Sequence, residues 1–225
     1  MADVSERVSG FTLIELMIVV AIVGILAGIA IPNLLSSRAV ANERAVIATL
    51  RTVTTAQTQC RGQSVLDLDR DGLGEALGLG ELAGTEFLRD GAGKLVPASL
   101  SASVGTLDPL GYAHCKGYLM ALYLPDAGGG GVLGTATNAG AVDPNHAEVA
   151  WTLLAWPITR GTTGTASYFV NQSGEILTTI ANYDGTTTIP LPGSGLAGVA
   201  PTQIVGGALA ANTVGADGNV WRVLQ

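Results

Sequence analysis

The hydrophobic positions are concentrated in one stretch near the start of the chain. Residues 16–31 read LMIVVAIVGILAGIAI, and with residues 11–14 before them the apolar run is interrupted by Glu15 alone. As an α-helix, the 19 residues from Leu13 to Ile31 span roughly 28 Å, about the thickness of the hydrocarbon core of a bilayer. We therefore predict a hydrophobic transmembrane helix over residues 11–32.

A second helical pattern follows Pro32, since residues 33–61 contain neither Gly nor Pro. Apolar residues recur there at helical spacing on one face, opposite two arginines: Val46, Leu50, Val53 and Cys60 against Arg44 and Arg51. The pattern predicts the amphipathic half of one long helix, about 75 Å from Phe11 to Cys60. Pro32 removes a backbone hydrogen bond, which predicts a kink or, alternatively, a helix end.

The pattern changes after Gly62, because 28 of the 31 glycines lie beyond Cys60. Short runs rich in Tyr, Val, Ile, Leu and Thr, bounded by turn residues, predict strands at 117–124, 148–156, 165–170 and 175–181. The last two predict a hairpin whose turn is 171–174, with Tyr168, Val170, Ile176 and Ile180 contributing to a face that packs on the helix. The composition of residues 182–225, rich in Thr, Gly, Ala and Pro, predicts long loops and one late strand, at 202–205 or 219–224.

These elements predict an α+β fold in which the long N-terminal helix packs on an antiparallel β-sheet with long Gly- and Thr-rich loops. Residues 62–225 would form the globular head domain. The 225 residues carry a net charge of −7, only 13% are charged and 48% are hydrophobic, which excludes a disordered chain. Lysine occurs only at Lys94 and Lys116, so no basic face is available and we expect no direct nucleic-acid binding.

Glu15 is the one ionisable residue in the apolar run, and its presence there needs an explanation. An ionisable group inside a membrane helix costs several kcal/mol and is retained mainly where it has a partner or a role. Alternatively, Thr12-x-x-Glu15 matches a capping box that satisfies free N–H groups at the helix start. Gly24 and Gly28 form a Gly-x-x-x-Gly pattern that allows helices to approach closely, or they only soften the helix. A cleaved signal peptide fits poorly, because the first ten residues are not basic.

Residues 9–27, SGFTLIELMIVVAIVGILA, closely resemble the amino-terminal signature of type IV pilins and of the related pseudopilins of type II secretion. The resemblance implies that residues 1–10 are a leader peptide, removed by prepilin peptidase between Gly10 and Phe11. The same enzyme would methylate the new amino group of Phe11. Glu15 would be required for methylation and for docking each subunit into a growing filament, and Pro32 is also a feature of the family.

The resemblance implies a structural protein and not an enzyme. The chain would be an inner-membrane precursor in contact with lipid, passed by an inner-membrane assembly platform into a helical homopolymer, an extracellular pilus. The first alternative is a pseudopilin in a periplasmic pseudopilus. A second alternative from a different class is a membrane-anchored extracytoplasmic binding domain, which would keep its amino terminus uncut.

Cys60 and Cys115 are the only cysteines of the chain. A domain exported beyond the inner membrane meets an oxidising compartment, and this predicts a disulfide between them. The alternative is two buried free thiols.

An acidic segment follows the helix, with carboxylates at alternate positions and a glycine for a sharp turn: Asp67, Asp69, Asp71, Gly72 and Glu75. This pattern resembles the first half of a calcium-binding loop. The twelfth position holds Gly78, so Glu75, Glu81 or Glu86 would have to complete the ligand shell of Ca²⁺; no other cofactor is expected. The alternative is a solvated acidic turn.

The remaining motifs do not indicate catalysis. Residues 193–198 spell a dinucleotide fingerprint without the strand and helix that it requires. His114 and His146 belong to no nucleophile or metalloprotease motif.

Overall fold

The computed structural model describes residues 11–224, so the predicted leader 1–10 with Gly10 lies outside the described residues. The chain divides into two units, one ending at Arg38 and one that begins at Ala39. The first unit contains the apolar part of the long helix, and the second contains the rest of that helix and the head.

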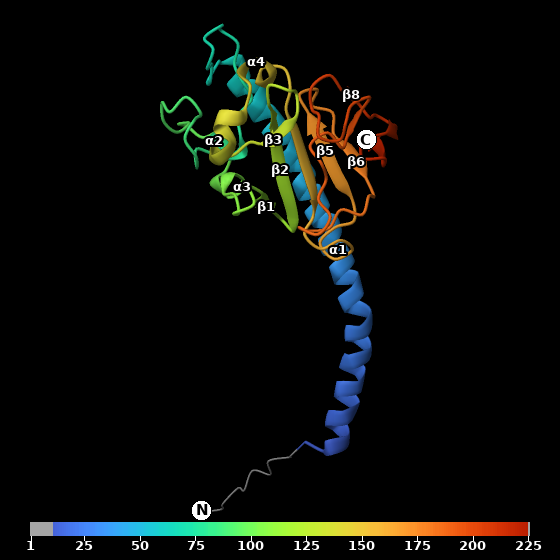
Figure 1. Ribbon diagram of the computed structural model, residues 1–225. Coiled ribbons are helices and arrows are strands. Elements are labelled where there is room, and N and C mark those ends of the chain that lie inside the picture. The colour runs from blue at the N-terminus through green and yellow to red at the C-terminus, as the bar shows by residue number, and fades with distance from the viewer. Residues whose placement is uncertain (1–10, 225) are drawn as a thin grey trace, which may run out of the picture. The chain divides into compact units, whose positions relative to one another are not determined.

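One long helix dominates the described chain (Figure 1). The helix continues through Pro32 and does not end there. The predicted long helix is therefore confirmed, and the alternative of a helix end at Pro32 is excluded. The other helices are short. The helices are α1 Leu13–Gly62, α2 Leu79–Leu82, α3 Ala102–Gly105, the 3₁₀ helix η1 Ala136–Ala141 and α4 Pro144–Ala147.

The strands pair mainly into one antiparallel sheet of order β1-β2-β4-β5-β6-β10-β9, with β3 also paired to β2, and a separate pair β7-β8. The strands are β1 Ala113–Cys115, β2 Tyr118–Pro125, β3 Gly131–Leu133, β4 Thr152–Pro157, β5 Ser167–Asn171, β6 Leu177–Thr179, β7 Leu196–Ala197, β8 Ala208–Leu209, β9 Thr213–Val214 and β10 Val220–Val223. The predicted α+β fold, a long helix with an antiparallel sheet, is confirmed.

The predicted strands differ in how well they match. Those at 117–124, 165–170, 175–181 and 219–224 correspond to β2, β5, β6 and β10, and β5 and β6 form the predicted antiparallel hairpin. The strand predicted at 148–156 begins only at Thr152, because Glu148 caps the end of α4. Of the two candidates for one late strand, 219–224 holds β10, whereas 202–205 forms only the isolated bridge of Gln203 to Gly130. The prediction of a single late strand is wrong, because β7, β8 and β9 also form in residues 182–225.

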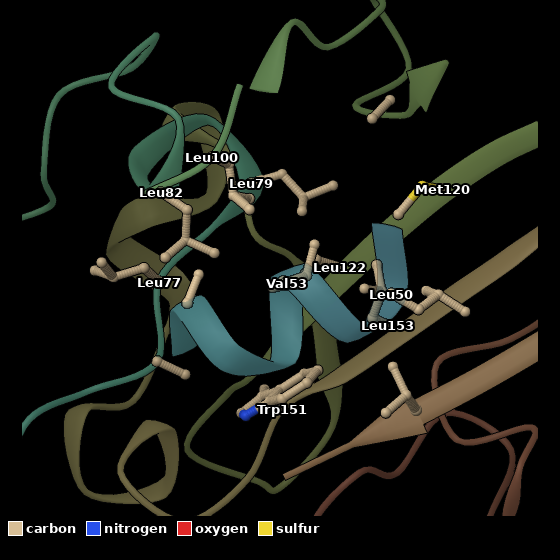
Figure 2. Close-up of a cluster of buried hydrophobic side chains, with 14 of the residues drawn as sticks. Leu50, Val53, Leu77, Leu79, Leu82, Leu100, Met120, Leu122, Trp151 and Leu153 are labelled. Atoms are coloured by element: carbon tan, nitrogen blue, oxygen red, sulfur yellow. The ribbon is translucent and has the colours of Figure 1, made fainter. Parts of the chain in front are cut away.

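The first hydrophobic core lies between the second half of α1 and one face of the sheet (Figure 2). Leu50 and Val53 of α1 meet Met120 and Leu122 of β2 and Leu153 of β4. The predicted apolar face of the helix is therefore the face that packs on the sheet. Ile180 is an exception to the predicted sheet face, because it is 72% exposed.

A second core covers the opposite face of the same sheet. Strand β2 is buried at every position, and its residues alternate between the cores: Met120 belongs to the helix side and Leu119 to the other. The C-terminal segment supplies the cover through Leu196, Ile204 and Trp221. The loops expected over residues 182–225 therefore form a layer that covers this face of the sheet through a few buried side chains, which the sequence analysis did not anticipate.

The predicted disulfide requires a correction, because Cys60 and Cys115 are free thiols in the structure. The Cys115 Sγ lies 3.5 Å from the Thr49 Oγ1, whereas the Cys60 Sγ lies 3.4 Å from the Ser99 Oγ. Thr49 and Cys60 are separated along α1 by roughly 16 Å at the rise of a helix. That separation is far beyond the reach of a disulfide, so the alternative of two free thiols describes the structure.

Candidate functional site

The apolar half of α1 exposes its side chains on all sides within its unit. Every large apolar residue from Phe11 to Ile31 is at least half exposed, with Phe11 at 83%. The segment is long and apolar enough to cross a membrane. Apolar surface of this extent is unfavourable in water, so the segment requires lipid or other protein chains around it.

Glu15 is held at the start of this helix by Thr12. Its Oε2 accepts hydrogen bonds from the Thr12 backbone N–H at 2.9 Å and from the Thr12 hydroxyl at 2.8 Å. In return, the Glu15 N–H donates to the Thr12 Oγ1 at 3.2 Å. The capping box is thus formed, and it holds the Glu15 carboxylate at the start of the apolar segment.

Gly24 and Gly28 lie on one face of the same segment, four residues apart. At either position, a Cβ would meet no side chain or other segment of the chain within 4 Å. The helix runs on beyond these glycines through Pro32. Both glycines therefore leave backbone accessible to a neighbouring helix, as close helix approach requires.

The acidic loop after α1 brings three of its predicted ligands together. One carboxylate oxygen from each of Asp67, Asp69 and Asp71 lies within 4.8 Å of the other two. The Gly72 N–H donates to the Asp67 Oδ2 at 3.1 Å, and Gly72 has φ +94°, so this turn needs glycine. Two of the three aspartates, Asp69 and Asp71, are exposed.

Glu75 does not join these aspartates, which corrects its prediction as a ligand. Its Oε1 accepts from the Leu68 N–H at 2.7 Å, and its Oε2 lies 3.6 Å from the Arg89 guanidinium. Burial raises the pKa of the Glu75 carboxyl, opposed by the Leu68 N–H and by Arg89. Glu81 pairs with the same arginine at 3.3 Å, and Glu86 accepts from the Ala136 N–H at 3.3 Å.

Glu148, at the C-terminal end of α4, is a buried carboxylate near the loop that the sequence analysis did not single out. It is only 7% exposed, and its Oε1 is buried with no hydrogen-bond partner among residues 11–224. Burial, followed by the negative charges of Asp71 and Asp69, raises the pKa of the Glu148 carboxyl. Since Glu148 is more than 70 residues away in sequence, no local spacing rule reveals it.

The two histidines are occupied by ordinary contacts. The His114 Nε2 lies 3.0 Å from the Asp108 Oδ2, and the His146 Nδ1 lies 3.0 Å from the Asp126 backbone oxygen. Neither contact brings a nucleophile beside a histidine.

Comparison with known proteins identifies the amino-terminal segment. The model of the prokaryotic N-terminal methylation motif matches residues 7–31. The type IV major pilin protein PilA of Myxococcus xanthus is 55% identical over 53 residues, 24% of this chain and 24% of that protein. The type IV wide pilus major component PilA4 of Thermus thermophilus is 56% identical over 45 residues, 20% of this chain and 34% of that protein.

These similarities confirm the resemblance to type IV pilins that the sequence indicated. The matches span a quarter to a third of the length of the two pilus proteins. No solved structure matches the chain.

Proposed function

We propose that this chain is the structural subunit of a type IV pilus-like filament. The observation that carries the proposal is the exposed apolar helix with a single carboxylate, Glu15, placed inside the matched methylation motif. Burying such a helix among copies of itself removes a large apolar surface from water, and the same surface suits a bilayer before assembly.

Processing of the amino terminus would supply the positive charge that pairs with the Glu15 carboxylate. Cleavage after Gly10 by a prepilin peptidase, with N-methylation of Phe11 by the same enzyme, leaves a positive amino group at Phe11. The amino group of one subunit then neutralises the Glu15 carboxylate of its neighbour inside the apolar bundle. A buried pair of this kind fixes the register of one subunit against the next, because either charge alone would be strongly unfavourable.

In this proposal the precursor lies in the inner membrane, and an assembly platform then passes the processed subunit into an extracellular filament. The names of the two relatives, both major pilus components, favour a pilus over a pseudopilus and a structural role over an enzymatic one. The two alternatives that must be distinguished from a pilus subunit are a pseudopilin and a membrane-anchored binding domain.

Mass spectrometry of the amino-terminal peptide tests the proposal, with sheared surface material and membranes analysed separately. We expect a peptide that begins with N-methylated Phe11 in the sheared fraction. The same peptide confined to membranes would indicate a pseudopilin. A chain that retains Met1 to Gly10 in both fractions would leave an anchored domain and refute the filament.

A further inference from the structure

We propose that the exposed face of α1 in the second unit, which begins at Ala39, binds the acidic loop 67–71 of a second copy of this chain. This contact rests on the proposed function, because it joins neighbouring subunits of the filament. Charge is distributed unevenly between the helix and the rest of the chain. Residues 33–61 carry four arginines and one glutamate, whereas residues 62–225 carry six basic and 14 acidic side chains. The helix is therefore basic and the rest of the head is acidic.

The basic face of α1 lies opposite the face that packs on the sheet. Arg44, Ala48, Arg51 and Thr55 recur at helical spacing, and all four are exposed. Leu50, on the other side of the helix, is completely buried in the first core. Within residues 39–224 this outer face of α1 is thus left without a cover.

Neither arginine of this face is neutralised within its own chain. Within residues 11–224, Arg44 and Arg51 form no ion pair. The adjacent acid, Glu43, is turned toward the start of β5, where its Oε1 accepts from the Thr165 N–H at 2.9 Å and from the Ala166 N–H at 3.3 Å. The two guanidinium groups, about 10 Å apart along the helix, are therefore available to an anionic partner.

The loop that follows α1 offers the matching negative charge. Asp69 and Asp71 are exposed, and one carboxylate oxygen of each lies within 4.8 Å of the other. Within the described chain, the Asp71 Oδ1 accepts from the Leu73 N–H at 2.8 Å, and the Asp69 Oδ1 accepts from the Asp71 N–H at 3.4 Å. The second oxygen of each aspartate can accept from a guanidinium group, and two close carboxylates attract it more strongly than one.

The loop and the arginines lie at different levels along the head. Figure 1 shows the loop at the end of the head where α1 ends. Arg51 and Arg44 precede Gly62, the last residue of α1, by 11 and 18 residues, which is about 16 Å and 27 Å along the helix. A second copy displaced by this amount along the helix axis brings its loop beside the arginines of the first. The contact joins two different surfaces, so it can repeat from copy to copy, as an open filament requires.

Charge selects a second copy as the occupant of this face. Acidic heads repel one another when they pack closely, unless basic surface lies between them. The outer face of α1 supplies such a surface, and complementary charge fixes which surfaces meet, because contacts between like charges are unfavourable. Anionic lipid headgroups could also pair with the arginines. The two occupants are distinguishable, because only the loop of another copy can be exchanged in charge together with the arginines.

Charge exchange in the full chain tests the contact, with filaments measured by immunoblots of sheared surface material. Arg44→Glu combined with Arg51→Glu is expected to lower the amount of filaments at least about tenfold, with an unchanged level in membranes. Asp69→Arg combined with Asp71→Arg should have the same effect. All four substitutions together should restore at least about half of the wild-type amount, because each new glutamate then meets a new arginine.

Lys116→Glu combined with Arg222→Glu is the matched control, since it reverses two exposed basic side chains that lie outside α1. This control should yield filaments like the wild type. An equal loss in the control would assign the effect to net charge and overturn the inference. Wild-type amounts of filaments from Arg44→Glu with Arg51→Glu would also overturn it. Failure of the four substitutions to restore filaments, although the protein folds, is the outcome expected if lipid headgroups hold the arginines.

Cross-linking decides the question if a charge-reversed head fails to fold. Arg51→Cys combined with Asp69→Cys keeps Arg44 and Asp71 in the contact. Treated with a short bis-maleimide in sheared filaments, it should give a ladder of multimers on denaturing gels, well above that of either single variant. A double variant without this ladder would overturn the inference. Absence of filaments from the wild type would refute the proposed function itself, whereas wild-type filaments without this contact refute only the contact.

Discussion

At the scale of single residues, Gly164 is fixed by the packing of Tyr118. A Cβ at position 164 would overlap the Tyr118 hydroxyl and ring, and that hydroxyl donates to the Ala166 carbonyl at 2.9 Å. We predict that Gly164→Ala lowers the free energy of unfolding by about 1–3 kcal/mol, as overpacking does. Urea denaturation in detergent measures the change. Gly140→Ala, where nothing lies within 4 Å, is the control; equal stabilities of the two variants would contradict the prediction.

The residue scale also shows where sequence reasoning fails. Residue types and spacing predicted the cluster of Asp67, Asp69 and Asp71, because its members are neighbours in one loop. They did not predict Glu148, and they paired Cys60 with Cys115 wrongly. Both failures concern partners distant in sequence, whose proximity depends on the tertiary fold and not on local pattern.

At the scale of elements, Glu43 links helix α1 to the start of strand β5. Its Oε1 accepts from the Thr165 N–H at 2.9 Å, the Thr165 hydroxyl at 3.1 Å and the Ala166 N–H at 3.3 Å. We predict that Glu43→Ala lowers the free energy of unfolding by about 1–2 kcal/mol, the lower part of the range for an unsatisfied donor, because Thr165 is exposed.

Glu43→Gln is the matched comparison, since its amide oxygen still accepts these hydrogen bonds. It should lose less than half as much stability as Glu43→Ala in the same urea titration. If Glu43→Ala unfolds like the wild type, the apolar face of α1 alone holds the helix on the sheet.

The elements predicted best from the sequence are those with a regular pattern of apolar residues. The buried face of α1 follows the period of a helix, and the apolar runs at β2 and β5 are bounded by turn residues. Strands β1, β3, β7, β8 and β9 were missed because each has only two or three residues, too few for a pattern. Strand β6 is as short, but it lies within the longer predicted run 175–181. The predicted strand at 202–205 failed because Ile204 is buried by the second core and not by a strand partner.

At the scale of the whole molecule, the fold class could be predicted but the second core could not. Period-two alternation places half of β2 toward the helix, yet a strand buried on both faces reads as a continuous apolar run. Its second cover comes from a Gly-, Thr- and Pro-rich segment whose composition is that of loops. Within residues 11–224 nothing covers the apolar half of α1, and the filament proposal makes its cover the same helix of other copies.

That proposal separates two roles of Glu15, capping the helix and registering subunits. Glu15→Ala removes both, whereas Thr12→Val removes the hydroxyl of the capping box and keeps the carboxylate. A lost cap costs only about 1 kcal/mol, while a subunit without Glu15 leaves its neighbour's amino group unpaired in an apolar bundle, at several kcal/mol.

We therefore predict that Glu15→Ala accumulates in membranes at the wild-type level and is absent from sheared surface material, while Thr12→Val still yields filaments. Immunoblots of the two fractions measure both proteins. Assembly of Glu15→Ala would show that the carboxylate is not required for register. Loss of assembly in both variants would assign the effect to the start of the helix, because the carboxylate is intact in one of them.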